Sequence, residues 1–328
     1  MNLGVGFTIP TEHLHQDKYF PSFTQLPKPA IPSIASGAGP VFMDSVIALG
    51  GFPGATDAWA KLKKALRFHR NKQCQLRDVQ ITLMFEGWGQ SDHSIENAFY
   101  MFLARFLGGK PEPILGPLVE QLKNARNANR TEFSRFMAEY DVDLKAERFA
   151  AYSEIIGEYF HCYEEFNQTA VYARLGIPLP PESIATSSAF ESTRMFYGNA
   201  YEVLGMHLDV VAAVNNMCSG RDYDQMQAMD LKQYRTIKKS NRTKCFSSNS
   251  ELSWFVEEYD SQVRNASHHR WFKIDDAKRV ILYRSGGTGA LHKMSYAEYL
   301  YRCNRLFFRI CAMACWEIIM LHMTNQKL

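Results

Sequence analysis

Three long stretches of apolar residues at helical spacing constrain the fold of this chain more than any other feature. They cover residues 147–175, 188–217 and the segment after Ser295, and in each the apolar side chains recur at three- and four-residue steps. Gly176 ends the first stretch, and Ser295 with Glu298 forms a capping box that opens the third. Helices of comparable length bury such stripes against one another. We therefore predict a mainly α fold with an antiparallel helical bundle in its C-terminal part.

The N-terminal part of the chain has a different composition. Residues 1–55 contain more than half of the prolines, which exclude regular helix there, and the apolar residues between them argue against a free tail. We expect an extended arm over residues 1–55. Helical periodicity begins after it, so we predict a helical N-terminal region over residues 56–145 and a helical domain over residues 146–328.

Charge and cysteine content limit the classes of function. The formal net charge is +3 for 328 residues, so any attraction to nucleic acid must come from a local patch. The 7 cysteines form no Cys-x-x-Cys pair, and their odd number fits reduced thiols and a cytoplasmic location. We expect neither a bound metal nor a cofactor, because no cluster of ligating residues stands out.

Two segments of the chain bear on targeting and membrane insertion. Residues 1–10 lack the basic start and apolar run of a signal peptide. The most apolar segment, residues 306–323, is interrupted by Arg309, Glu317 and His322. Such polar residues favour a buried helix, so we expect no membrane association.

Residues 248–269 contain the densest group of reactive side chains. Ser248 with Glu251 forms another capping-box pattern, and apolar residues at helical steps follow it, so we predict one continuous helix. Its far end carries Arg264, Asn265, His268 and His269. A purely structural explanation also exists. Arg264 is one turn after Asp260, its possible ion-pair partner, and the two histidines would favour a helix C-terminus.

The spacing of these residues resembles the motif of the HEPN superfamily, in which four to six residues lie between an Arg, most often followed by Asn, and a His. Here the segment is Arg264-Asn265-Ala266-Ser267-His268-His269, and of the 10 histidines only His269 has an Arg at the required spacing. The resemblance covers about residues 248–325. It implies a HEPN-like helical bundle with a short β-hairpin after the motif helix.

For catalysis, the resemblance implies a metal-independent endoribonuclease, acting as a toxin or an anti-phage defence effector. The 2′-hydroxyl of the RNA would attack the adjacent phosphorus. His269 would transfer protons, Arg264 would stabilise the negative charge of the phosphorane, and Asn265 would orient phosphate or imidazole. On a continuous helix, however, His268 shares the face of Arg264, so either histidine remains a candidate.

The same resemblance implies partners. One acid–base residue per chain is few for a reaction that needs both an acid and a base, so we expect a homodimer that brings two motifs together. An antitoxin or an activating ligand is a further possible partner of such an effector. The alternative function is a catalytically inactive HEPN-like module that binds a nucleotide or a protein partner.

A cationic run precedes the motif. It lies between residues 231 and 246, contains no acid, and consists of Lys232, Arg235, Lys238, Lys239, Arg242 and Lys244. It is a candidate contact for the RNA backbone, and the alternative is a solvated loop.

Two short strands are predicted after the motif, at residues 271–275 and 279–284. The glycine-rich segment 286–289 lacks the Lys-Ser/Thr pair of a phosphate loop, so we interpret it as a turn.

Overall fold

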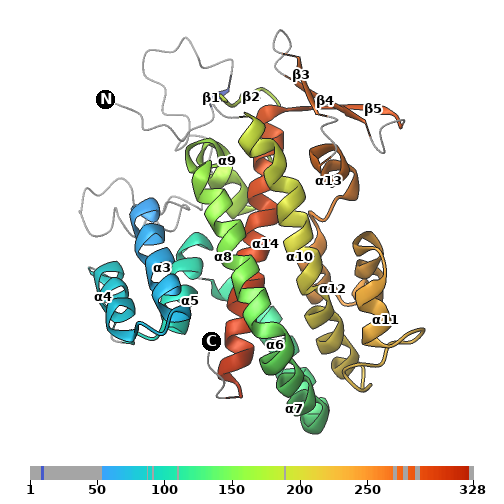
Figure 1. Cartoon of the computed structure of the whole chain (residues 1–328). Helices are drawn as coiled ribbons and strands as arrows, with labels where there is room; N and C mark the ends of the chain where they lie inside the picture. The colour runs from blue at the N-terminus through green and yellow to red at the C-terminus, as the bar shows by residue number, and fades with distance from the viewer. Residues whose placement is uncertain are drawn as a thin grey trace, which may run out of the picture. The chain divides into compact units, whose positions relative to one another are not determined.

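The structure is a computed structural model that describes residues 9–10, 54–86, 88–90, 92–108, 111–187, 190–268, 272–275, 280–284 and 289–324. It is mainly helical, as predicted (Figure 1). The chain forms two compact units. Unit 1 includes residues 157–201 and 258–308 besides the N-terminal segment, and unit 2 includes residues 54–156, 202–257 and 309–328. The predicted domain boundaries at residues 55 and 145 remain a prediction.

The predicted N-terminal arm lies almost entirely outside the described residues. Its described part, apart from the start of the first helix, is Ile9–Pro10 (β1), which pairs antiparallel with Ser183–Ile184 (β2) in unit 1.

Unit 2 begins with a series of helices. These are α3 (Ala55–Arg70), α4 (Cys74–Phe85), α5 (Ile95–Phe106), α6 (Glu112–Ala128) and α7 (Arg130–Glu139). A π-helical turn, Tyr140–Leu144, leads from α7 into α8 (Lys145–His161). The start of α5 is fixed by Ser94, whose hydroxyl accepts a hydrogen bond from the amide of Asn97 at 3.2 Å.

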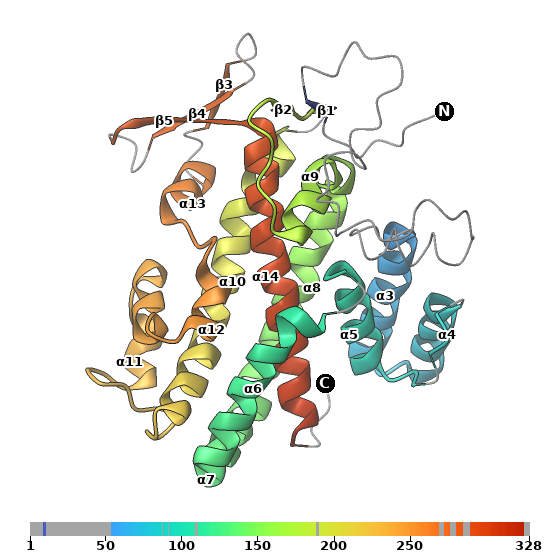
Figure 2. The ribbon, with the colours of Figure 1, turned by 180° about the vertical axis from the view of Figure 1, so that it is seen from behind.

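The second part of unit 2 contains the C-terminal portions of two long helices, α10 (Phe190–Cys218) and α14 (Tyr296–His322), which Figures 1 and 2 show as continuous. Between them lie α11 (Leu231–Thr236), a 3₁₀ segment (Lys239–Phe246), α12 (Ser250–Ser253) and a 3₁₀ turn (Trp254–Val256). Trp316 of α14 is fully buried, and its Nε1 donates to the carbonyl oxygen of Leu118 at 2.8 Å. This residue anchors α14 to α6 within the core of unit 2.

Unit 1 has an aromatic core. The ring of Tyr159 at the end of α8 stacks on Phe166 of α9 (Tyr163–Leu175) and on Phe307 of α14, with centroid separations of 4.8 and 3.9 Å. The Tyr159 hydroxyl donates to Asn304 at 2.6 Å, so its polar group is satisfied. The predicted helix over residues 147–175 is therefore divided at Cys162 into α8 and α9. Tyr159 and Phe166, which belong to its apolar stripe, stack on each other across this break.

A three-stranded antiparallel sheet also belongs to unit 1, in the order β3 (Lys273–Asp275), β4 (Val280–Arg284) and β5 (Leu291–Ser295). β3 and β4 fall within the two segments predicted as strands, whereas β5 was not predicted. Ile281 of β4 faces Met294 of β5, and both are buried. The hydroxyl of Ser295 accepts from the amide of Glu298 at 3.0 Å, so α14 begins at the predicted cap.

The prediction of one helix over residues 248–269 is wrong. The segment contains α12, the 3₁₀ turn and a separate helix, α13 (Ser261–His268). Asn249 rather than Ser248 caps α12, accepting from the amide of Leu252 at 3.1 Å. Asp260 accepts from the amide of Gln262 at 2.8 Å and so starts the second helix. Since Asp and Asn side chains compete with the helix for backbone amides, two capping residues divide the segment.

α13 packs closely against α10 within unit 1. The amide of Gly198 donates to the hydroxyl of Ser267 at 3.2 Å, and that hydroxyl donates to the carbonyl oxygen of Arg194 at 2.5 Å. The guanidinium of Arg194 donates to the carbonyl oxygen of Ser267 at 2.9 Å. A Cβ atom at position 198 would lie 1.9 Å from Cδ2 of His268, so glycine is what permits this close approach.

This packing yields a stability prediction. Gly198→Ala should lower the free energy of unfolding by about 1–3 kcal/mol through overpacking, which exceeds the roughly 0.5–1 kcal/mol that Ala gains over Gly within a helix. Denaturant unfolding measures the change. His268→Ala removes the atoms that clash, so the double variant should recover most of the loss. Additive losses in the double variant would contradict this packing.

Candidate functional site

Helix α13 brings together three of the four predicted catalytic residues. Val263, Ala266 and Ser267 form its buried side, whereas Arg264, Asn265 and His268 are partly exposed. The Arg264 guanidinium donates to the side-chain oxygen of Asn265 at 2.9 Å. His268 is the last residue of the helix, and His269 lies outside the described residues.

The acid nearest to Arg264 along the helix has other partners. The carboxylate of Asp260 caps α13 and accepts from Nη2 of Arg302 at 2.8 Å. Arg305 of the same helix pairs with Glu258 at 2.5 Å. The two arginines of α14 therefore hold the linker that precedes α13. Asp260 therefore both caps α13 and joins its start to α14.

The cationic run belongs to unit 2, and only part of it remains available to a ligand. Arg235 pairs with Asp209 and Glu139, each at 2.6 Å, and Lys239 pairs with Glu202 at 2.6 Å. Arg242 is buried and donates to the carbonyl oxygen of Gly205 at 2.8 Å. The described exposed members are Lys232, Lys238 and Lys244. Acids from α7 and α10 thus compensate a run that contains no acid in sequence.

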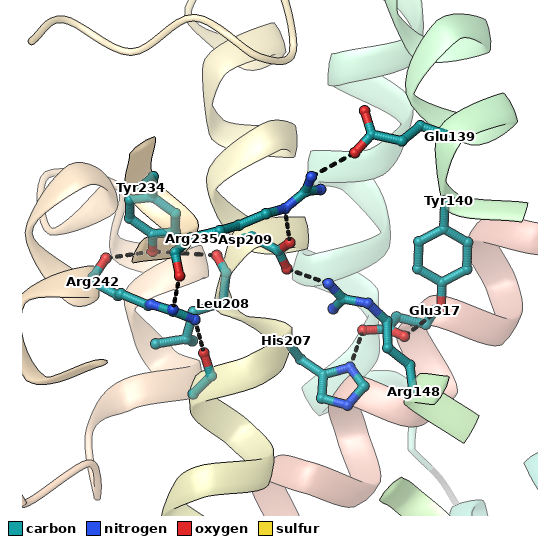
Figure 3. Close-up of polar contacts among 11 residues, drawn as sticks. Glu139, Tyr140, Arg148, His207, Leu208, Asp209, Tyr234, Arg235, Arg242 and Glu317 are labelled. Atoms are coloured by element: carbon teal, nitrogen blue, oxygen red, sulfur yellow. Dashed lines mark hydrogen bonds and ion pairs between the residues drawn. The ribbon is translucent and has the colours of Figure 1, made fainter. Parts of the chain in front are cut away.

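Unit 2 also contains a buried polar network that sequence reasoning missed (Figure 3). Glu317 of α14 is fully buried and accepts from Tyr140 at 2.5 Å and from Nδ1 of His207 at 2.7 Å. The ring of Tyr152 stacks on His207 with a centroid separation of 4.1 Å. Glu317 and His207 thus join α14, α10 and the π-helical turn.

A chain of charges lies in the same region of Figure 3. Arg148 of α8 donates to Asp209 of α10 at 2.6 Å, and Asp209 accepts a second hydrogen bond from Arg235, which also reaches Glu139. Arg148 and Asp209 are 3% and 2% exposed, so solvent does not satisfy them. Each buried charge therefore depends on its partner.

The network determines protonation states. Burial alone would raise the pKa of Glu317, but His207, Arg148 and Tyr140 outweigh that effect and hold it below the usual value. Burial lowers the pKa of His207 despite the adjacent carboxylate. Asp209 behaves like Glu317, because Arg148 and Arg235 keep its pKa low against the effect of burial. Since His207 and Glu317 are fully buried, we interpret the network as support for the fold rather than as a substrate contact.

In the sequence, only Glu317 indicates that such a buried polar network exists. It is an acid within an otherwise apolar segment, and a buried carboxylate requires hydrogen-bond donors. The identity of those donors, His207 and Tyr140, depends on packing between segments that are far apart in sequence.

Carboxylates of unit 2 form one group that deserves a test as a metal site. The oxygens of Glu132, Asp222 and Asp224 lie within 4.8 Å of one another. However, Arg135 pairs with Glu132 at 2.5 Å, and the amide of Tyr223 donates to the same carboxylate at 3.3 Å. Because the buried Glu132 already has these partners, the group does not by itself define a metal site.

Comparisons of the chain with protein-family models, with curated proteins and with solved structures find no match. The HEPN resemblance therefore depends on residues 264–269 and their context. Among the described helices, none combines the length and the apolar composition that a membrane crossing requires.

The buried chain of charges predicts that removing Arg148 lowers stability much more than removing the exposed Lys123. Arg148→Met should cost about 3–5 kcal/mol of unfolding free energy, because it leaves the buried Asp209 with one cation. Lys123→Met is the control, since Lys123 pairs with Glu120 at an exposed position and should cost less than about 1 kcal/mol. Urea unfolding at neutral pH measures both changes. Equal small losses would contradict the assigned burial.

The low pKa of His207 predicts acid sensitivity. In the unfolded chain a histidine takes up a proton near pH 6.5, whereas burial keeps folded His207 neutral, so stability should fall as the pH decreases below about 6.5. His207→Asn retains a donor for Glu317 and should reduce this slope by up to about 1.4 kcal/mol per pH unit. Unfolding curves between pH 4.5 and pH 7.5 measure it, with the exposed His161→Asn as the control. An unchanged slope in His207→Asn would refute the buried neutral state.

Proposed function

We propose that the protein is a metal-independent endoribonuclease of HEPN type, acting as a toxin or an anti-phage defence effector. The observation that carries the proposal is the hydrogen bond between Arg264 and Asn265 on the partly exposed side of α13, the helix that ends at His268. Arginine, amide and imidazole groups are the types that phosphodiester cleavage through the 2′-hydroxyl requires.

The fixed position of α13 supports this chemistry. Asp260 holds the start of the helix, and Arg194 and Ser267 hold its end against α10. A guanidinium that is positioned in advance stabilises a developing negative charge without reorganisation during the reaction. Arg264 would bind the nonbridging phosphate oxygens, and Asn265 would limit its movement.

The two histidines would have different roles. The ring of His268 packs on Gly198, where a Cβ atom would clash with it, so its volume contributes to helix packing. We assign to His268 a positioning role. His269, which follows the spacing of the family, would take the proton of the 2′-hydroxyl or donate one to the leaving 5′-oxygen.

A single acid–base group per chain favours a homodimer in which two copies of the motif share one RNA. Within the proposal, the 2′-hydroxyl is the nucleophile, the 5′-oxygen leaves, and the product ends in a 2′,3′-cyclic phosphate. An antitoxin or an activating ligand would control such an effector in the cell. Lys232, Lys238 and Lys244 are the exposed candidates for the RNA backbone, and their contribution should weaken with salt.

Substitution of the motif tests the proposal. With a labelled oligoribonucleotide in EDTA, Arg264→Ala should reduce cleavage at least about 100-fold, and His269→Ala should reduce it by about 100- to 10,000-fold. His268→Ala should retain more activity than His269→Ala but should unfold at lower denaturant concentration. Gel analysis of the cyclic-phosphate products measures cleavage.

His161→Ala provides the control, because this histidine is exposed at the end of α8 and should leave the rate unchanged. Dimer content by light scattering and helix content by circular dichroism should remain unchanged in Arg264→Ala and His269→Ala. Full activity of both variants would refute the assignment. RNA binding by the wild type without cleavage would favour the alternative, an inactive HEPN-like binding module.

A further inference from the structure

Unit 2 contains a cavity of about 510 Å³. It is lined by the end of α10, the loop after it, α11 and the 3₁₀ segment Lys239–Phe246. A cavity of this size can hold a small organic ligand. The buried network of His207 and Glu317 does not contribute to its lining.

Two cations face this cavity. Nη2 of Arg221 donates to Asn216 at 3.1 Å, whereas its Nε is buried and has no hydrogen-bond partner among the described residues. Lys244 is exposed, and among the described residues its ammonium pairs with no carboxylate. The residues that line the cavity include no Asp or Glu. The cavity therefore carries positive charge, which favours an anionic ligand.

The acids nearest in sequence do not cancel this charge. Asp222 and Asp224 gather with Glu132, where Arg135 lies 4.0 Å from Asp224. Asp230 is occupied as the N-cap of α11, in a capping box with Gln233. None of these carboxylates lines the cavity.

The remaining wall suits a flat heterocycle with polar edges. Met226 and Met229 line it from a tight turn, closed by a hydrogen bond of 3.0 Å from the amide of Met226 to the carbonyl oxygen of Met229. Thioethers are polarisable and pack well against aromatic rings. The side chains of Asn241 and Gln227 are exposed on the same cavity and provide amide donors and acceptors for a base edge.

We propose that this cavity binds a nucleoside monophosphate, with the phosphate between Arg221 and Lys244 and the base against Met226 and Met229. The site lies within unit 2, whereas the motif helix belongs to unit 1. Binding here does not depend on RNA cleavage by α13. The site extends the protein's chemistry beyond the proposed ribonuclease activity, to recognition of a free nucleotide.

Isothermal titration of the full chain with the four ribonucleoside 5′-monophosphates tests the proposal. At least one of them should bind with a Kd below about 1 mM. Arg221→Gln and Lys244→Gln should each weaken that binding about tenfold, through loss of a charged contact to phosphate. Lys123→Gln is the control, because Lys123 is an exposed cation of α6 that does not line the cavity, and it should change the affinity less than about twofold.

Three results would overturn the proposal. They are the absence of binding by all four nucleotides, equal affinity for the unphosphorylated nucleoside, and equal affinity for inorganic phosphate. Lys244 is exposed, so its variant should fold normally, and a thermal unfolding curve verifies this. Because the readout is heat of binding rather than cleavage, nucleotide binding by a cleavage-deficient His269→Ala protein would separate this site from the proposed catalytic one.

Discussion

The structure of unit 2 depends on one constraint, the presence of the carboxylate of Glu317 within an apolar and fully buried part of α14. An ionised carboxylate in such surroundings is stable only if donors surround it. Tyr140 and His207 supply these donors from the π-helical turn and from α10. Nearby, Arg148 forms a buried ion pair with Asp209. The polar groups thus specify how three elements meet, and Trp316 and the apolar residues of α14 around Glu317 are buried as well.

In unit 1, small residues determine how two helices, α13 and α10, pack against each other. Gly198 lets α13 approach α10, and the Ser267 hydroxyl satisfies backbone groups at the contact. The buried side of a helix of eight residues is thereby fixed, and its other side presents Arg264 and Asn265. A short helix has little stability of its own, so these tertiary contacts are what would hold a catalytic guanidinium in place. The contact between α13 and α10 is thus the part of the fold on which the proposed chemistry of Arg264 depends.

The sequence predicted what depends on local pattern. The long helices follow their apolar stripes, and Ser295 starts α14 as its capping box indicates. The division of residues 248–269 was missed because Asn249 and Asp260 cap two short helices, and Tyr197 holds the linker between them through the carbonyl oxygen of Glu258 at 2.5 Å. The ion-pair partners of Arg235 and Lys239 were missed because the acids lie on other helices, far away in sequence. The motif residues were found from spacing alone, and their catalytic role remains a proposal.

Cleavage of a 2′-deoxy-substituted substrate by the wild-type protein tests the central claim most directly. An all-ribose oligonucleotide in EDTA should yield fragments with 2′,3′-cyclic phosphate ends, and replacing the ribose at the cleaved position by 2′-deoxyribose should abolish cleavage there, because the nucleophile is removed. Cleavage of the deoxy-substituted position, products without cyclic phosphate, or no cleavage of the all-ribose substrate would contradict a metal-independent ribonuclease at Arg264 and His269.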